Sequence, residues 1–462
     1  MDKRGKVFDR AFMRTLLTLA LPIIIQFFLT SCVNMLDTLM IGRVGENELA
    51  AVGVAGRLYY LFHLTIAGVS AGCAVFMSQF WGKEDTAGIR RVVGVGLCGI
   101  LFFSAIFTAA GLFFPEQTLA IFSDDAAVIA LGREYLVIVC LSYVANGVTS
   151  LLNHMLRCIG NARAPMYVSL FAIICNGVLN YALIFGKMGF PAMGVRGAAI
   201  ATVIARLLEV AATASLMLAR NFPLKGKLRE FFDFDFAFFK QVARKSAPVI
   251  ANEGLYALGI WMYTIAYGHI GTGALAATQI TQTVCDMLFV LSYGVSGAAL
   301  VIVGNLIGAG DEEKARDYAR RITVTSFIMG AVIGAVIALG APAVVEFFNI
   351  TPETAATAVM LLRIAGGFTA ISTTGTMLIV GVFRGAGDAA YALRAEMFAM
   401  WCVAIPLAFL GSFVLGLSTV WVGLLVQFEN VVKFFIGLVH LKGGKWIHRI
   451  VREDVEEVYE SL

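Results

Sequence analysis

The sequence predicts an all-α polytopic membrane protein, with twelve transmembrane helices in two pseudo-symmetric six-helix lobes. Composition is the first observation: 59% of the 462 residues are hydrophobic and only 14% are charged, whereas an average soluble domain is about 25% charged. The apolar runs are the second, because they are continuous and about 20 residues or longer, as spanning helices require. They do not show the alternating ten-residue pattern of a membrane barrel.

An internal repeat is the third observation. Residues 22–85 align without a gap with residues 248–311, a shift of 226, and 15 of the 64 positions are identical. Pro22 matches Pro248 in this register, and the segment 157–161 matches 384–388 at a shift of 227. The whole chain is therefore a duplicated unit of about 225 residues. Such long repeats in an apolar chain indicate a transporter whose binding site lies between the halves.

Each repeat supplies six predicted spans. They are 15–40, 49–80, 92–114, 129–152, 165–186 and 197–219, followed by 246–268, 274–307, 322–345, 357–382, 395–415 and 419–441. Because six is an even number, the repeats are expected to be parallel, related by an axis along the membrane normal. We expect an N-lobe at 1–219, a cytoplasmic connection at 220–245 and a C-lobe with a cytoplasmic tail at 246–462.

Lys and Arg predict the orientation of the chain. With the N-terminus placed inside, 27 of the 35 basic residues fall in inner segments, four within spans and four outside, namely Arg43, Arg133, Lys187 and Arg196. This bias places both termini in the cytoplasm. The connection 220–245 is rich in Lys, Arg and Phe, and is expected to lie on the inner leaflet as an amphipathic segment.

Ionisable and amide side chains within the first six spans indicate a site for a coupling ion. Asp37 lies near the outer end of the first span, Asn176 and Asn180 lie one turn apart on one face of the fifth, and Thr202 lies in the sixth. A carboxylate, two amides and a hydroxyl at similar depth could hold a small hard cation such as Na⁺. Asp37 could equally carry a proton, because burial disfavours its charged form.

The second half has its own acids. Glu253 and Asp286 lie near mid-membrane in spans seven and eight. Their charge should attract a cationic substrate, protons or Na⁺, so we expect a substrate site or second cation site there. Gln26 and Asn34, in the first span, are further candidates for this site.

Two pairs of opposite charge are expected to be structural. Arg206 and Glu209 are three residues apart, and Glu429 and Lys433 four apart, so each pair can neutralise itself on one helix face. The eight Cys form no CxxC pair and the five His show no metal-ligand spacing. With no Walker motif either, transport energy is expected from an ion gradient, and no cofactor is expected.

At this point the sequence resembles the MATE family, the multidrug and toxic compound extrusion transporters of bacterial type. The resemblance covers essentially the whole chain. It is carried by an ordered set of local patterns: Leu21–Pro22, the segment 37–42, Leu49–Ala50–Ala51, Gly82 with Asp85, the segment 157–161 and the segment 197–202.

The resemblance implies a secondary antiporter that expels organic cations against H⁺ or Na⁺. It also implies that Asp37, Asn176, Asn180 and Thr202 form the N-lobe cation site, although part of the family has an acid where Asn180 stands. Glu253 matches a C-lobe acid of one bacterial branch. That branch has a further acid in span ten, near which this chain has Thr373 or Thr374.

We therefore expect a cell-membrane efflux antiporter for small lipophilic organic cations, monomeric and without nucleic-acid partners. The main alternative is a flippase for lipid-linked saccharides, which should favour a more cationic cavity able to hold pyrophosphate. A membrane-embedded enzyme is a third class, but no paired nucleophile and base is found. The sequence leaves open the natural substrate, the choice between H⁺ and Na⁺, and the direction in which Asp286 faces.

Overall fold

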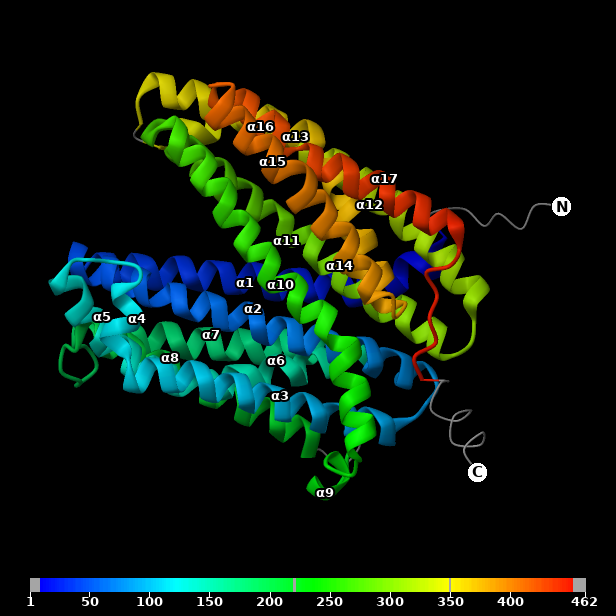
Figure 1. The fold of residues 1–462 in the computed structure, drawn as a ribbon. Coiled ribbons are helices and arrows are strands. Elements are labelled where there is room, and N and C mark those ends of the chain that lie inside the picture. Colours follow the sequence, from blue (N-terminus) through cyan, green and yellow to red (C-terminus); the bar gives the residue numbers. More distant parts are fainter. Residues whose placement is uncertain (1–8, 219–221, 349, 452–462) are drawn as a thin grey trace. The chain divides into compact units, whose positions relative to one another are not determined.

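The computed structural model describes residues 9–218, 222–348 and 350–451, and these residues are helical throughout, with no strand among them. Eleven helical stretches are long and apolar enough to cross a membrane. A twelfth long helix, α10, occupies the predicted seventh span and is more polar, since it carries Asn252 and Glu253. The all-α polytopic membrane fold predicted from the sequence is confirmed (Figure 1).

The first half contains nine helices and one 3-10 turn within the described residues. Their bounds are α1 Arg10–Gly42, α2 Glu46–Gly82, α3 Thr86–Phe113, α4 Pro115–Ala120, α5 Ala126–Val139, η1 Cys140–Ser142, α6 Tyr143–Cys158, α7 Arg163–Phe185, α8 Gly194–Leu218 and α9 Leu228–Phe231. The predicted fourth span is thus the combined α5, η1 and α6.

The second half begins with α10, Phe236–Ile270, and α11, Thr272–Gly308. The remaining elements are α12 Glu312–Val345, α13 Pro352–Thr376, η2 Met377–Phe383, α14 Ala389–Met397, η3 Phe398–Ala404, α15 Ile405–Phe409, η4 Leu410–Val414, α16 Thr419–Val426 and α17 Phe428–Gly443. Three of these, η2, η3 and η4, are π-helical segments that lie in the predicted tenth and eleventh spans.

The chain forms two compact units. The N-terminal unit comprises 25–81 and 85–250, and the C-terminal unit comprises 1–24, 82–84 and 251–462. Three helices therefore contribute to both units: α1 changes unit after residue 24, α10 changes after residue 250, and α2 gives only its last residue, Gly82, to the C-terminal unit. The changes in α1 and α10 each lie two residues beyond a helix-interior proline, Pro22 or Pro248, and these prolines are equivalent in the repeat.

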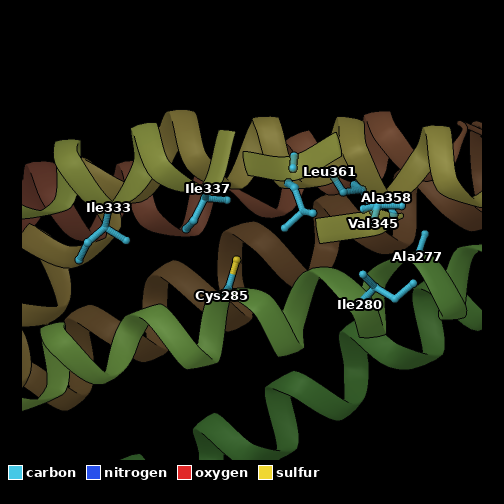
Figure 2. Close-up of a cluster of buried hydrophobic side chains, with 10 residues drawn as sticks. Ala277, Ile280, Cys285, Ile333, Ile337, Val345, Ala358 and Leu361 are labelled. Atoms are coloured by element: carbon cyan, nitrogen blue, oxygen red, sulfur yellow. The ribbon is translucent and has the colours of Figure 1, made fainter. Parts of the chain in front are cut away.

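Each unit has its own apolar core. In the C-terminal unit, Ile280 and Cys285 of α11 pack with Ile333 and Ile337 of α12 and with Leu361 of α13 (Figure 2). In the N-terminal unit, Ala55 and Leu58 pack with residues of α4, α5 and α8. Burial of such side chains holds the polar groups of neighbouring helix faces at fixed positions.

The connection between the halves is partly helical. Its short helix α9 lies on α3, where the carbonyl oxygen of Phe231 approaches Gly94 and Arg90 Nε lies 3.2 Å from Glu230 Oε2. Gly94 is needed at this contact, since a Cβ atom there would overlap the Phe231 backbone. The last ten residues of the predicted connection belong to α10.

Candidate functional site

Asp37 and the two predicted amides come together in the N-terminal unit. Asp37 is half-buried, five residues before the end of α1, while Asn176 and Asn180 are buried on α7. Asn180 Nδ2 donates to Asp37 Oδ1 at 2.5 Å and to Asn176 Oδ1 at 3.1 Å. The i/i+4 spacing therefore places both amides on the face of α7 that meets the carboxylate.

The orientation of the Asn180 amide decides what this site can do. Both of its N–H groups are used, whereas its Oδ1 is buried without a partner among the described residues. This arrangement suits Asp37 as a bare carboxylate, because N–H groups stabilise negative charge. Rotation of the amide by 180° would present Oδ1 instead, which could accept a hydrogen bond from protonated Asp37 or coordinate a small cation.

Thr202, the fourth predicted ligand, lies on α8 in the same unit. Its hydroxyl donates to the Ala198 carbonyl at 3.0 Å and shares a hydrogen bond with the half-buried Tyr135. Arg206, one turn further along α8, is close enough to Asp37 for their charges to interact. The sequence analysis did not identify Tyr135 as part of this site, because one aromatic residue in an apolar span carries no distinguishing signal.

Gln26 does not join Asp37 but lies in a buried polar chain. Arg157 Nη2 donates to Gln26 Oε1 at 2.5 Å, and Gln26 Nε2 donates to Ser169 Oγ at 2.7 Å. Ser169 Oγ then donates to Glu209 Oε1 at 3.1 Å, and Glu209 Oε2 accepts from Arg206 at 2.7 Å. The predicted Arg206–Glu209 pair is therefore present, and it ends a network that leads to Gln26.

Asn34 is exposed on α1, one turn before Asp37. Its carbonyl oxygen accepts from the Thr38 hydroxyl at 2.8 Å, and within the described chain no contact joins its side chain to Asp37. In the C-terminal unit, Asp286 is likewise exposed and is 3.4 Å from its α11 neighbour Gln282. The structure therefore leaves both side chains outside the hydrogen-bonded clusters.

Glu253 has a buried partner. Its Oε1 accepts from Arg384 Nη1 at 2.8 Å, and the Arg384 side chain is only 3% exposed. Glu253 and Arg384 are 131 residues apart, as are Gln26 and Arg157. The same clamp between the first and fourth spans thus occurs in each repeat, with a carboxylate in one and an amide in the other.

A second buried cluster surrounds Lys433. Lys433 Nζ lies 2.7 Å from Glu429 Oε1 and 3.7 Å from Glu396 Oε1. Asn252 Nδ2 donates to Glu396 Oε2 at 2.7 Å, and the Tyr263 hydroxyl donates to Glu429 Oε2. The predicted Glu429–Lys433 pair is present, but Glu396 was not anticipated, because it lies 33 positions before Glu429 and 144 after Asn252.

Curated relatives cover nearly the whole chain. The probable multidrug resistance protein NorM of Thermotoga maritima is 25% identical over 454 residues, 96% of both chains. Multidrug resistance protein NorM of Burkholderia vietnamiensis is 28% identical and covers 93% of this chain and 94% of its own. The uncharacterized transporter YisQ of Bacillus subtilis is 25% identical over 91% of this chain and 92% of its own.

Solved structures share the fold. A MOP superfamily transporter from Pyrococcus furiosus, described as having a reverse polarity of its binding pocket, superposes with a TM-score of 0.84 at 20% identity, over 96% of this chain and 97% of its own. An outward-facing multidrug resistance MATE family transporter superposes with a TM-score of 0.83, also at 20% identity and with the same coverage. At this identity the likeness concerns the fold.

The family comparison follows the internal repeat. The MatE model matches residues 22–182 and again residues 248–410, so its two matches begin 226 positions apart. This offset equals the shift of the repeat found in the sequence. Since the two matches together cover well over half of the chain, the protein belongs to the MatE family of membrane transporters.

Proposed function

We propose that this transporter is a secondary active antiporter that exports small lipophilic organic cations in exchange for inward-moving H⁺ or Na⁺. The carrying observation is Asp37, a half-buried carboxylate in a spanning helix that accepts a hydrogen bond from Asn180. A carboxylate at such a position is costly in free energy, and it therefore indicates an ion pathway. The names of the multidrug resistance relatives support the export of drugs.

The distribution of charge favours cations over anions as substrates. Arg206, Arg384 and Lys433 each have a Glu partner at 2.7 to 2.8 Å, so these basic groups are neutralised inside their own unit. Asp37 and Asp286, by contrast, form no ion pair within the described residues. A lipid-linked saccharide with its pyrophosphate would need several unpaired basic groups. Of the four basic residues in the buried clusters, Arg157 alone has a neutral partner, the Gln26 amide, which makes a flippase the weaker proposal.

Coupling follows from competition between ion and substrate. Binding of H⁺ or Na⁺ at Asp37 favours one access state, and binding of the organic cation favours the other. Each ligand shifts this equilibrium only by its differential affinity for the two states. We further propose that the lobes 1–219 and 246–462 are the moving bodies, that the protein acts as a monomer, and that it lies in the cytoplasmic membrane with both termini inside.

The test is counter-transport in proteoliposomes. Wild type and Asp37→Asn are reconstituted with a lipophilic cationic dye, and a pH gradient and a Na⁺ gradient are imposed separately. We expect one gradient to drive dye movement in the wild type, which names the ion, and we expect Asp37→Asn to abolish that movement. Asp124→Asn is the matched control, since it removes a carboxylate from an exposed loop of the same unit.

Unchanged dye movement in folded Asp37→Asn would overturn the mechanism. Absence of dye movement under both gradients in the wild type would overturn the substrate class. Activity on a lipid-linked saccharide would then support the flippase in its place.

A further inference from the structure

A buried cluster around Lys433 contains more negative than positive charge. We call it the Lys433 cluster, and its members are Asn252, Tyr263, Glu396, Glu429 and Lys433. The two Glu side chains and Lys433 are 5–8% exposed, and Asn252 is 3% exposed as a residue. Two carboxylates around one ammonium leave a net charge of −1. An uncompensated charge buried in this way is costly, so a proton taken up by one carboxylate relieves the imbalance.

The two carboxylates are not equivalent. Glu429 has the close ion pair with Lys433, at 2.7 Å, and also accepts from the Tyr263 hydroxyl. Glu396 is 3.7 Å from the same ammonium and accepts its short hydrogen bond from the neutral amide of Asn252. The charged form of Glu429 is therefore the better stabilised, and the proton belongs on Glu396.

Asn252 can form a hydrogen bond with Glu396 whether or not Glu396 carries a proton. Its Nδ2 donates to the carboxylate, while its Oδ1 is buried without a partner within the described chain. Rotation of this amide turns Oδ1 toward Glu396, where it accepts a hydrogen bond from the carboxylic acid. Asn180 has the same pattern beside Asp37, with both donors used and Oδ1 unpartnered.

The internal repeat relates this cluster to the Gln26 chain of the N-terminal unit. Adding the repeat shift of 226 to Gln26 gives Asn252, and adding 227 to Ser169 gives Glu396. The hydrogen bond from Asn252 to Glu396 thus corresponds to the hydrogen bond from Gln26 to Ser169, over 144 and 143 positions. The second half therefore has a carboxylate where the first half has a hydroxyl.

The titratable groups around the cluster supply no second positive charge to Glu396. On α10 the cluster faces Tyr256 and Tyr263, and Tyr267 lies one turn beyond. Tyr293 and Asp286 of α11 interact electrostatically with Tyr256. Glu253 and Arg384 form an ion pair with each other. On α13, the uncharged Gly375 packs against Lys433, since a Cβ on this glycine would lie 3.3 Å from Lys433 Cβ. No further basic side chain forms an ion pair with Glu396 in the described part of the chain.

A π-helical segment begins directly beyond Glu396. Glu396 is the penultimate residue of α14, and η3 starts at Phe398. Wide helical turns of this kind are uncommon and occur frequently at functional sites, where they redirect side chains. Glu396 therefore lies on a stretch of backbone whose geometry differs from that of the equivalent α7, which is α-helical from Arg163 to Phe185.

We propose that Glu396 is a second proton-binding site of this transporter, held in the C-terminal unit by Lys433, Glu429 and Asn252. In the binding step an O–H bond forms between a proton from water and the Glu396 carboxylate, and the charge of the cluster changes from −1 to 0. The proton leaves by the reverse step during each transport cycle. This inference rests on the proposed antiport and deepens it, because it adds a proton to those exchanged per substrate.

Infrared pH titration of the purified full-length protein tests proton binding without transport. A protonated carboxyl group has its own C=O absorption, so wild type should show a carboxylic-acid band component that is lost in Glu396→Gln and kept in Asp37→Asn. Glu429→Gln should also remove the band, because Glu396 then pairs with Lys433 alone and stays ionised. Glu353→Gln is the control, an exposed Glu of the same unit, and should leave the band unchanged.

Stoichiometry provides the second measurement. At zero membrane potential, each coupled proton allows about a tenfold steady-state dye gradient per pH unit. We expect Glu396→Gln to retain dye export but to lower this gradient by about tenfold per pH unit relative to wild type. A band and a gradient that are both unchanged in Glu396→Gln would overturn the second site and leave the proposed antiport intact. If the wild type moves no dye but its band is lost in Glu396→Gln, the proton site is supported and the antiport is overturned.

Discussion

At the scale of single residues, the two repeats make the same contact from neighbouring positions, because the shift of 226 takes Gln26 to Asn252, one residue before Glu253. Gln26 and Glu253 both hold an arginine 131 positions further along the chain. The sequence placed Glu253 among groups that meet substrate or a cation, because a lone acid in a span has that meaning by default. Its pairing with Arg384 also gives Glu253 a structural role, as the local counter-charge of a buried guanidinium.

Substitutions at Glu253 should separate these two roles. Glu253→Leu leaves Arg384 without its partner, and we expect a loss of about 1–3 kcal/mol in stability, as for other hydrogen bonds to charged groups. Glu253→Gln should lose less, because its amide oxygen can still accept, as Gln26 does from Arg157. Thermal unfolding in detergent measures both variants, and gradient-driven dye export should persist in Glu253→Gln.

The reverse pattern would contradict the structural role of Glu253. If Glu253→Gln unfolds at the wild-type temperature but loses dye export, the carboxylate acts on the ion or the substrate. Asp37 provides the comparison, since Asp37→Asn is expected to lose export without losing stability.

Spacing explains which site residues could be predicted. Asn176 and Asn180 lie one turn apart, and the sequence alone placed them on one face toward Asp37. Glu396 could not be placed in this way, because its partners lie on helices that are distant in the sequence. Local spacing contains no information on such contacts, although the repeat shift of 227 does connect Ser169 with Glu396.

At the scale of elements, long apolar runs predicted each spanning helix to within a few residues at most ends. The π-helical segments η2, η3 and η4 were not predicted. Such a segment arises from a shift of the backbone hydrogen bonds by one residue. In a run that is apolar on every face, this shift leaves no change of periodicity that could be detected.

Close helix contacts make a prediction at this scale. In α12, Gly334 lies against the carbonyl oxygen of Gly366 in α13, and a Cβ on Gly334 would be 2.2 Å from that oxygen. We expect Gly334→Val to separate the two helices, to disturb the core shown in Figure 2, and to cost at least about 1–3 kcal/mol. The unfolding midpoint in detergent measures this loss.

Gly340 of the same helix is the matched control. A Cβ there meets no atom within 4 Å, so Gly340→Ala should be neutral or slightly stabilising, as a helix-interior change from Gly to Ala usually is. Equal unfolding midpoints for Gly334→Val and Gly340→Ala would show that α12 and α13 do not depend on this close approach.

At the scale of the whole molecule, the duplication accounts for both the fold and the differences between its halves. Two copies of one six-span unit keep the basic residue of the last span, Arg206 or Lys433, and the clamp formed by Arg157 or Arg384. The acids beside these residues differ between the copies. Duplication therefore preserved the framework while each half acquired its own ionisable groups, which is the basis for expecting a separate ion-binding carboxylate in each half.

Orientation in the membrane is the prediction that belongs to the whole chain. The 27-to-4 bias of basic residues places the α7–α8 loop outside and the loop after α17 inside. In a variant without the eight native cysteines, a single cysteine at Lys187 should react with an impermeant maleimide added to intact cells. A cysteine at Lys445 should react only after the membrane is opened. The opposite labelling pattern would reverse the orientation, and with it the side from which H⁺ or Na⁺ must enter the Asp37 site.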